Sequence, residues 1–211
     1  MIDAVAGKRK QGLSTGEYLL AAMINRPGGY RMKLFRFTGS QAYRTLYYKD
    51  KEVARKYLGK LTGISLTSEW KKYEAEVRFK GEMGDFEPEI MDFGGLVGVV
   101  LTSKARKIVE DLILPFGEFL PLELDSSVVY LINPTIILDC VDYDKSEKEI
   151  IPPLNNEKIT KYFFKKEIDY PPIFRLKNEP RKHIINDEFA IRLKENNLVG
   201  YELRELWNSN S

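Results

Sequence analysis

Two stretches of the chain share one order of local patterns, and this order limits the folds open to it. Around residues 99–122, an apolar strand-like run is followed by a polar helix start, a helix with one apolar face, a glycine and a second strand-like run. Residues 184–206 follow the same order. Both have the length of right-handed strand–helix–strand crossovers, provided that their strands are parallel neighbours. Residue identity between them is poor, which indicates a shared plan and not a duplication.

Capping residues and hydrophobic spacing place the helices. Thr102 and Asn186 are of the type that caps helices, and each stands just before a segment with an apolar stripe. A third helix is predicted from a cap at Asp50 to about Leu61. The apolar face of the helix after Thr102 consists of Ala105, Ile108, Val109 and Leu112.

Alternation of apolar and polar residues predicts the strands, and it is clearest over 73–80. Residues 144–156 are predicted to be a polar connection, and 158–166 fit either a strand or a helix. The predicted fold class is therefore α+β: a mixed, strand-rich sheet with a few short helices and two strand–helix–strand units of similar plan. Further strands are predicted at 33–37, 97–101, 118–124, 128–132, 136–141 and 201–206.

Length and composition set the class of protein. A chain of 211 residues favours one large domain, and such a domain buries roughly 70% of its unfolded surface. The longest apolar runs are far too short to span a membrane, and no secretory signal is visible. The single cysteine rules out an internal disulfide. We therefore expect a cytoplasmic protein without a membrane partner.

The first 31 residues differ from the rest and are predicted to be an N-terminal extension of a single domain at 32–211. Codons for Gly28 and Gly29 can spell a ribosome-binding sequence at suitable spacing before Met32, which points to a start there. The alternative is a genuine N-terminal helix over 18–24 that packs on the domain. We expect a chain that begins at Met32 to fold and function as well as the full chain.

One histidine and one cysteine leave few catalytic options. A Cys140–His183 nucleophilic pair is conceivable, but Cys140 lies in a segment typical of a buried strand. A satisfied or solvated ring is a better interpretation of His183 than a general base. We therefore expect no enzyme activity, no catalytic residues, no metal site and no cofactor.

Charge is distributed in blocks along the chain. Residues 1–72 hold 15 basic and 5 acidic residues, whereas residues 73–149 hold 7 and 17, within an overall charge of +2. These blocks can be solvated faces that neutralise one another across the fold. Alternatively, the middle block presents a negative face to a basic partner.

Five acidic residues define the candidate partner-binding site. They crowd into the eleven residues 82–92, which contain Gly84 and Pro88 and follow Gly81, a composition typical of an exposed loop. The order of residues does not match a calcium-binding loop, so a metal is not expected. The candidate residues are Glu82, Asp85, Glu87, Glu89 and Asp92.

Three stretches, together extending over about residues 70–206, combine short strand-like runs and helix caps in a fixed order. The first stretch is Gly98–Ala105 with Glu118–Leu122; the second is Tyr130–Asn133 with Ile137–Ser146; the third is Ile173–Leu176, His183–Phe189 and Asn197–Tyr201. In this order they resemble a bacterial immunity-protein family of polymorphic toxin systems, immunity family 11. The family usually has serine at the second helix cap, where this chain has Asn186, and asparagine caps about equally well.

The resemblance implies an immunity protein that binds and neutralises a cognate toxin stoichiometrically, and it implies no catalytic residues. Toxin contacts vary within such a family, so no site residues are carried over. The alternative is a nucleic-acid-associated or phage-encoded accessory protein that uses the basic N-terminal third. The absence of a basic field over the whole protein weighs against a nucleic-acid partner. The tyrosines that support this alternative are Tyr43, Tyr47, Tyr48 and Tyr57.

Overall fold

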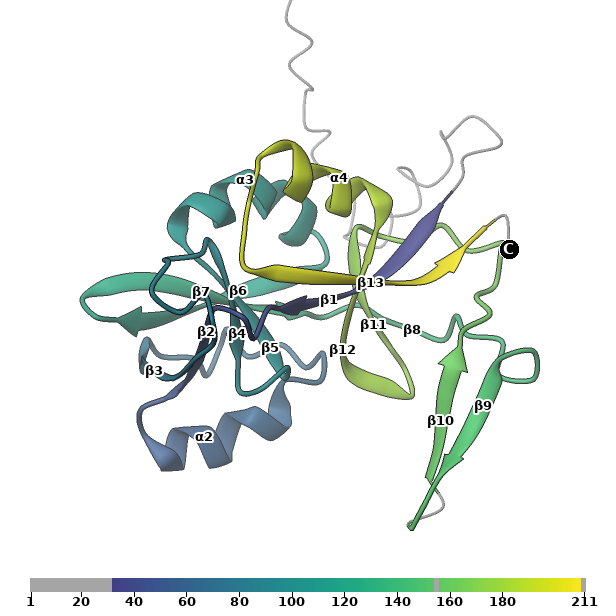
Figure 1. The fold of residues 1–211 in the computed structure, drawn as a ribbon, viewed down its shortest axis with the longest axis horizontal. Helices are drawn as coiled ribbons and strands as arrows, with labels where there is room; N and C mark the ends of the chain where they lie inside the picture. Colours follow the sequence, from purple (N-terminus) through teal and green to yellow (C-terminus); the bar gives the residue numbers. More distant parts are fainter. Residues whose placement is uncertain (1–31, 154–155, 210–211) are drawn as a thin grey trace, which may run out of the picture. The chain divides into compact units, whose positions relative to one another are not determined.

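The chain forms a closed six-stranded barrel and an open five-stranded sheet, and a pair of helices packs against them from one side (Figure 1). The computed structural model describes residues 32–153 and 156–209, which belong to one compact unit. Many strands and a few short helices in this part of the chain confirm the strand-rich α+β class. The predicted N-terminal extension, with its alternative helix at 18–24, lies outside the described residues.

The barrel has the strand order β2-β3-β6-β7-β5-β4. Neighbouring strands are antiparallel except in the pairs β3–β6 and β2–β4, which are parallel. Leu46, Phe93 and Leu131 belong to its interior cluster, the barrel core, which Tyr57 helps to close. The strands are β2 (Arg44–Tyr48), β3 (Tyr73–Lys80), β4 (Ile90–Phe93), β5 (Gly98–Leu101), β6 (Gly117–Leu124) and β7 (Ser127–Pro134).

The open sheet has the order β13-β1-β12-β11-β8, with only β11 and β8 parallel. Successive residues of a strand point to opposite faces, so the sheet contributes to two clusters. Phe37 and Ile185 belong to the middle core beneath the helices, whereas Leu34 and Ile184 belong to the outer core on the other face. The strands are β1 (Lys33–Gly39), β8 (Ile137–Leu138), β11 (Ile173–Leu176), β12 (Glu179–Asn186) and β13 (Tyr201–Asn208).

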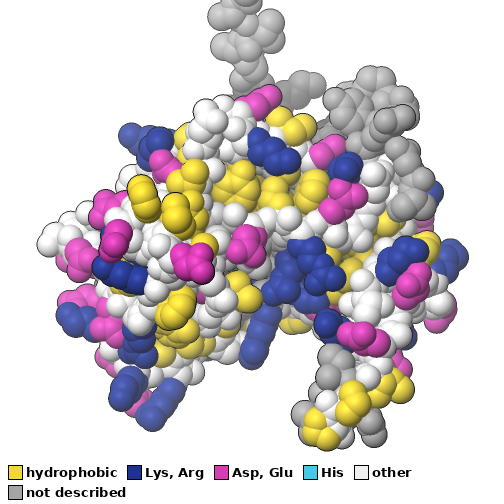
Figure 2. All heavy atoms as spheres, viewed as in Figure 1, with side chains coloured by type: hydrophobic (Ala, Val, Ile, Leu, Met, Phe, Trp, Pro, Cys, Tyr) yellow, Lys and Arg dark blue, Asp and Glu magenta, His cyan; other side chains and the backbone are white. Residues whose placement is uncertain are grey.

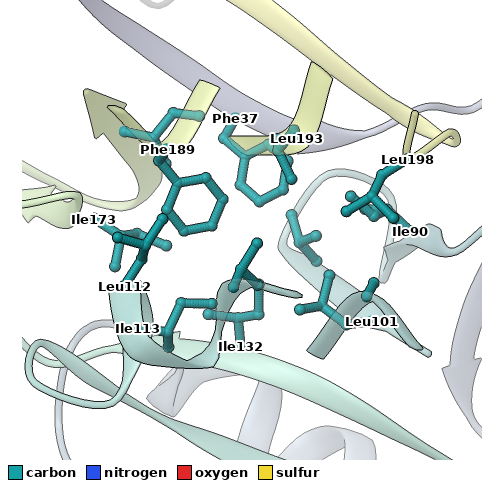
Figure 3. Close-up of a cluster of buried hydrophobic side chains, with 14 of the residues drawn as sticks. Phe37, Ile90, Leu101, Leu112, Ile113, Ile132, Ile173, Phe189, Leu193 and Leu198 are labelled. Atoms are coloured by element: carbon teal, nitrogen blue, oxygen red, sulfur yellow. The ribbon is translucent and has the colours of Figure 1, made fainter. Parts of the chain in front are cut away.

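Helices α3 (Ser103–Ile113) and α4 (Asp187–Glu195) begin at the predicted caps. The Thr102 hydroxyl accepts a hydrogen bond from the Ala105 amide, and the Asn186 side chain accepts one from the Phe189 amide. Both helices contribute to the middle core, where their side chains converge with those of the sheet and the barrel (Figure 3). No helix in the described part of the chain is long and apolar enough to cross a membrane.

Both strand–helix–strand units occur in the predicted order, but their strands are not neighbours. In β5-α3-β6, strand β7 lies between the two strands and runs antiparallel to both. In β12-α4-β13, strand β1 occupies the same position. Each pair of strands is therefore parallel across a third strand, a partner that local sequence patterns do not specify.

Two segments differ from the predictions. The strand expected over 136–141 ends at Leu138, so Cys140 is buried but lies outside any strand. The predicted polar connection contains β9 (Glu147–Ile151), which pairs with β10 (Asn156–Lys161) in a hairpin that projects from the rest of the unit (Figure 1). The ion pairs Lys148–Glu157 and Glu149–Lys158 link the two strands of this hairpin. Because charged residues occupy these paired positions, the sequence shows no clear apolar alternation there, and the strand β9 was not predicted.

The remaining helical segment begins at the predicted cap and extends to Lys60, close to the predicted end at about Leu61. Asp50 caps α2 (Lys51–Tyr57) by accepting a hydrogen bond from the Glu52 amide, and a 3₁₀ turn η1 (Leu58–Lys60) completes the segment. The segment places the buried Tyr57 and Leu61 against the barrel core.

Candidate functional site

The acidic segment forms a loop between β3 and β4, called here the 81–89 loop, and backbone hydrogen bonds hold it against residues 42–44. The Gly81 amide donates to the Tyr43 carbonyl and the Met83 amide to the Ala42 carbonyl, each at 2.7 Å. The Arg44 Nε donates to the Gly84 carbonyl at 2.9 Å. A Cβ at position 81 would lie 2.2 Å from the Gln41 carbonyl oxygen, so only glycine permits this approach.

Three of the five predicted acidic residues are exposed on this loop. Glu82 forms no ion pair with the other described residues, whereas Asp85 lies 3.8 Å from Lys80 and Glu87 lies 3.3 Å from Arg44. Exposed ion pairs of this kind contribute little stability, because water screens them. Their carboxylates therefore remain accessible to the cations of a partner.

Glu89 is largely engaged within the molecule. It accepts hydrogen bonds from the Lys104 Nζ at 2.6 Å and from the Val199 amide at 3.2 Å. Burial raises its pKa, but these hydrogen bonds outweigh burial and the net pKa is lowered. Glu89 fixes the end of the 81–89 loop to α3 and to the segment before β13.

The prediction that Asp92 lies on the exposed acidic surface is wrong. Asp92 is fully buried in β4, and burial raises the pKa of its carboxyl group. Its Oδ1 accepts a hydrogen bond from the Leu96 amide at 2.7 Å, within a turn where Gly94, Gly95 and Leu96 all have positive φ. Aspartate commonly opens turns of this kind. The glycine pair that follows Asp92 is the sequence signal from which this role could have been predicted.

Three exposed apolar side chains accompany the acidic residues: Phe79 is 54% exposed, Met83 39% and Phe86 63%. The alternation over 73–80 predicts that Phe79 lies on the buried face of its strand, and no sequence pattern marks Met83 or Phe86. Phe79 is exposed because β6 pairs with β3 only at Tyr73 and Glu74, so the far end of β3 extends beyond it. Large exposed apolar side chains grouped along the chain commonly mark interaction sites.

The two charge blocks partly neutralise each other in the fold. Basic residues of the N-terminal third form ion pairs with acidic residues of the middle block, which is the first of the two interpretations of the charge pattern. These pairs are Arg44–Glu87, Lys49–Glu74 and Lys72–Glu123.

The tyrosines behind the nucleic-acid alternative divide into two groups. Tyr48 and Tyr57 are buried in the barrel core, where no base could stack on them. Tyr43 and Tyr47 are partly exposed, and the Arg78 guanidinium lies over the Tyr47 ring. The structure therefore provides no continuous aromatic platform from these four residues.

Cys140 and His183 are both buried, and the described structure contains no hydrogen bond between them. Burial raises the pKa of the Cys140 thiol to about 12, which leaves it a poor nucleophile. Cys140 packs in the outer core, while His183 faces Phe37 across the β1–β12 ladder. Within residues 32–153 and 156–209, no three His, Cys, Asp or Glu side chains come together as a metal site.

Comparison with protein-family models finds no match for this chain, and neither does comparison with curated protein sequences. The resemblance to immunity proteins therefore stays a prediction.

Proposed function

We propose that this chain is an immunity protein, which neutralises a basic protein toxin by binding it stoichiometrically through the 81–89 loop and the end of β3. Two independent lines support this proposal. One is the resemblance of residues 70–206 to immunity proteins. The other is a fixed loop that offers both apolar and acidic side chains to a partner.

The observation that carries the proposal is the exposure of Phe86 and Met83 on a loop held by main-chain hydrogen bonds. Phe86 donates its amide to the Met83 carbonyl at 3.1 Å, and Gly84 donates to Gly81 at 3.0 Å. A loop that is already ordered loses little conformational entropy on binding. Aromatic residues and methionine are enriched at the centres of protein interfaces, whereas charged residues occupy their rims.

The acidic residues of the loop favour a basic partner. Glu82, Asp85 and Glu87 are exposed, and only Asp85 and Glu87 have ion-pair partners among the described residues, Lys80 and Arg44, in pairs that water screens. Rim charges chiefly accelerate association and determine its dependence on salt. A basic toxin domain would therefore be captured quickly at low salt and more slowly at high salt.

The direct test is protection. The toxin domain at the C-terminus of the neighbouring upstream reading frame is expressed in a bacterial host with and without this chain. We expect growth only in its presence, and a stoichiometric complex on size-exclusion chromatography. Cys140→Ala and His183→Ala should still protect if neutralisation needs no catalysis. Loss of protection in folded variants that retain binding would contradict the proposal.

Variants of the loop test the binding surface. Phe86→Ala should weaken toxin binding about tenfold, which corresponds to about 1.4 kcal/mol. The triple variant Glu82→Gln, Asp85→Asn, Glu87→Gln should slow association and flatten its dependence on salt in stopped-flow measurements. The matched control neutralises three exposed carboxylates elsewhere, at Asp125, Asp144 and Glu195. Equal effects of the two triple variants would assign the binding surface to another part of the chain.

A further inference from the structure

Strand β13 forms one edge of the open sheet, and among the described strands it pairs only with β1. Its ladder with β1 is regular from Tyr201 to Glu205, and a bulge then leaves Leu206 without a residue opposite. Just before the strand, the Ile90 amide donates to the Val199 carbonyl and covers the edge at that point. The main-chain groups of the regular part that point away from β1 therefore have no strand partner within the described part of the chain.

A free strand edge is a template for pairing with another chain, and proteins commonly block it with proline or with charged side chains. Residues 201–205 contain no proline, and their charges have both signs. Glu202, Arg204 and Glu205 are exposed, whereas Tyr201 and Leu203 are half-buried and pack against the middle core. Figure 2 shows acidic and basic side chains close together near the middle of this face, in the part of the view where Figure 1 draws β13. Such an edge excludes most strands but accepts one whose charges have the complementary order.

The order of charges along β13 is complementary to itself. When two copies of one strand pair antiparallel in a continuous sheet, the residues that meet lie on the same face. In the register centred on Leu203, Glu202 of each copy lies opposite Arg204 of the other, and Tyr201 lies opposite Glu205. This register pairs the whole regular part of the strand and none of the bulge. A register centred on Arg204 would bring two arginines together, and one centred on Glu202 would bring two glutamates together, both of which are unfavourable.

The same register offsets an unfavourable contact within each copy. Arg204 lies opposite Arg36 in the β1–β13 ladder and forms no ion pair with a described carboxylate, and the Arg36 Nε is buried without a hydrogen-bond partner. Glu202 of the second copy would add a carboxylate beside this pair of arginines. On the other face of the sheet, Phe37 lies opposite Leu203, so the two Leu203 side chains would join the apolar rows of both copies.

We propose that a second copy of this chain docks on the free edge of β13, so that the two open sheets join antiparallel about a two-fold axis at Leu203. Main-chain hydrogen bonds between residues 201–205 of the two copies hold the strands together, and the Glu202–Arg204 pairs fix the register. An interface centred on one pair of short strands is smaller than the roughly 1,600 Å² of a standard-size interface, so the dimer is weak and exchanges rapidly. The proposal does not depend on the toxin-binding function.

Sedimentation equilibrium of the full chain tests the proposal. The unchanged chain should shift from monomer towards dimer as its concentration rises from about 10 µM to about 1 mM, the range in which weak complexes form. Arg204→Glu and Glu202→Arg should each weaken self-association at least about tenfold, because two attractive pairs become repulsive. When these two variants are mixed in equal amounts, they should associate with each other, since every charge then meets its opposite. Arg204→Glu also removes the contact between like charges with Arg36, so this variant should fold.

Glu52→Arg and Arg55→Glu are the matched controls, because they reverse the two charges of an exposed ion pair on α2, and both should dimerise as the unchanged chain does. Hydrogen exchange then locates the interface: amides of residues 201–205 should exchange more slowly at high protein concentration than at low concentration. A full chain that stays monomeric, a dimer protected elsewhere, or a mixture of folded variants that does not associate would overturn the proposal. Slower exchange of these amides only when the toxin is added would assign the edge to the toxin instead. Protection of cells against the toxin is measured separately, so neither result decides the other.

Discussion

The two strand–helix–strand units follow one topology with different contents. Measured from their helix caps Thr102 and Asn186, the third residue of the helix is Ala105 in α3 and Phe189 in α4, and both are fully buried. The third residue before the cap is Val99 in β5 and His183 in β12, and both are buried. The equivalent helix positions thus hold a small side chain, Ala105, and a large one, Phe189. The equivalent strand positions hold an apolar side chain, Val99, and a polar one, His183.

The origin of the middle strand explains part of this difference. In the barrel unit, β5-α3-β6, the middle strand is β7, which follows the unit in the chain. The barrel closes without a free edge. In the sheet unit, β12-α4-β13, the middle strand is β1, which precedes the unit in the chain. The sheet stays open, with β13 at its edge. The middle strand of this topology can therefore come from a later or from an earlier part of the chain. The side chains of the two units differ because one unit lies in a closed barrel and the other in an open sheet.

The largest expected effect comes from making α4 resemble α3. Phe189→Ala should lower the free energy of unfolding by about 3–5 kcal/mol, because Phe189 fills the middle core against Phe37 and leaves a cavity when truncated. Urea denaturation measures this loss. The reverse change, Ala105→Phe, should cost about 1–3 kcal/mol through overpacking. A loss below about 1 kcal/mol for Phe189→Ala would show that α4 does not anchor the middle core.

The two helix caps should differ by a smaller amount. Asn186 is fully buried, and its Nδ2 also donates to the Tyr170 carbonyl, whereas Thr102 is half-buried and makes a single, longer bond of 3.3 Å. Asn186→Ala should cost about 2 kcal/mol and Thr102→Ala about 1 kcal/mol. Thermal unfolding of both variants checks the order, and a larger loss for Thr102→Ala would contradict it.

The smallest effect is a dependence on pH that only the sheet unit should show. Burial, followed by the charges of Arg175 and Arg36, holds the pKa of His183 well below its ordinary value of 6.5. The unfolded chain therefore binds more protons than the folded chain below that pH. Stability should fall as the pH decreases from 6.5, by at most about 1.4 kcal/mol per pH unit. His183→Val, which introduces the residue of the barrel unit, should remove this slope between pH 7.5 and 5.5 in denaturation curves. An unchanged slope would assign it to other groups.

Local patterns predicted the parts of the fold that local physics determines. The caps Asp50, Thr102 and Asn186 and the apolar faces of their helices are present, because hydrogen bonds and packing within a few residues define them. The order of strands in the barrel and the sheet could not be predicted, because it depends on pairings between residues far apart in the chain.

The candidate sites show the same division. Glu82, Asp85 and Glu87 were predicted correctly as exposed, because glycine and proline place charged residues in a loop. Asp92 was misassigned because its carboxylate is stabilised by the turn that follows it.

The reactivity of Cys140 can report how often the outer core opens. It is the only thiol in 211 residues, it is fully enclosed, and it packs in the outer core with Tyr170 and Phe164. With its pKa raised to about 12, almost none of it is thiolate at neutral pH while the core is closed. A thiol-specific reagent can therefore modify the chain only during the moments when this core separates. The rate of labelling would time those moments in an unmodified protein, without an introduced probe.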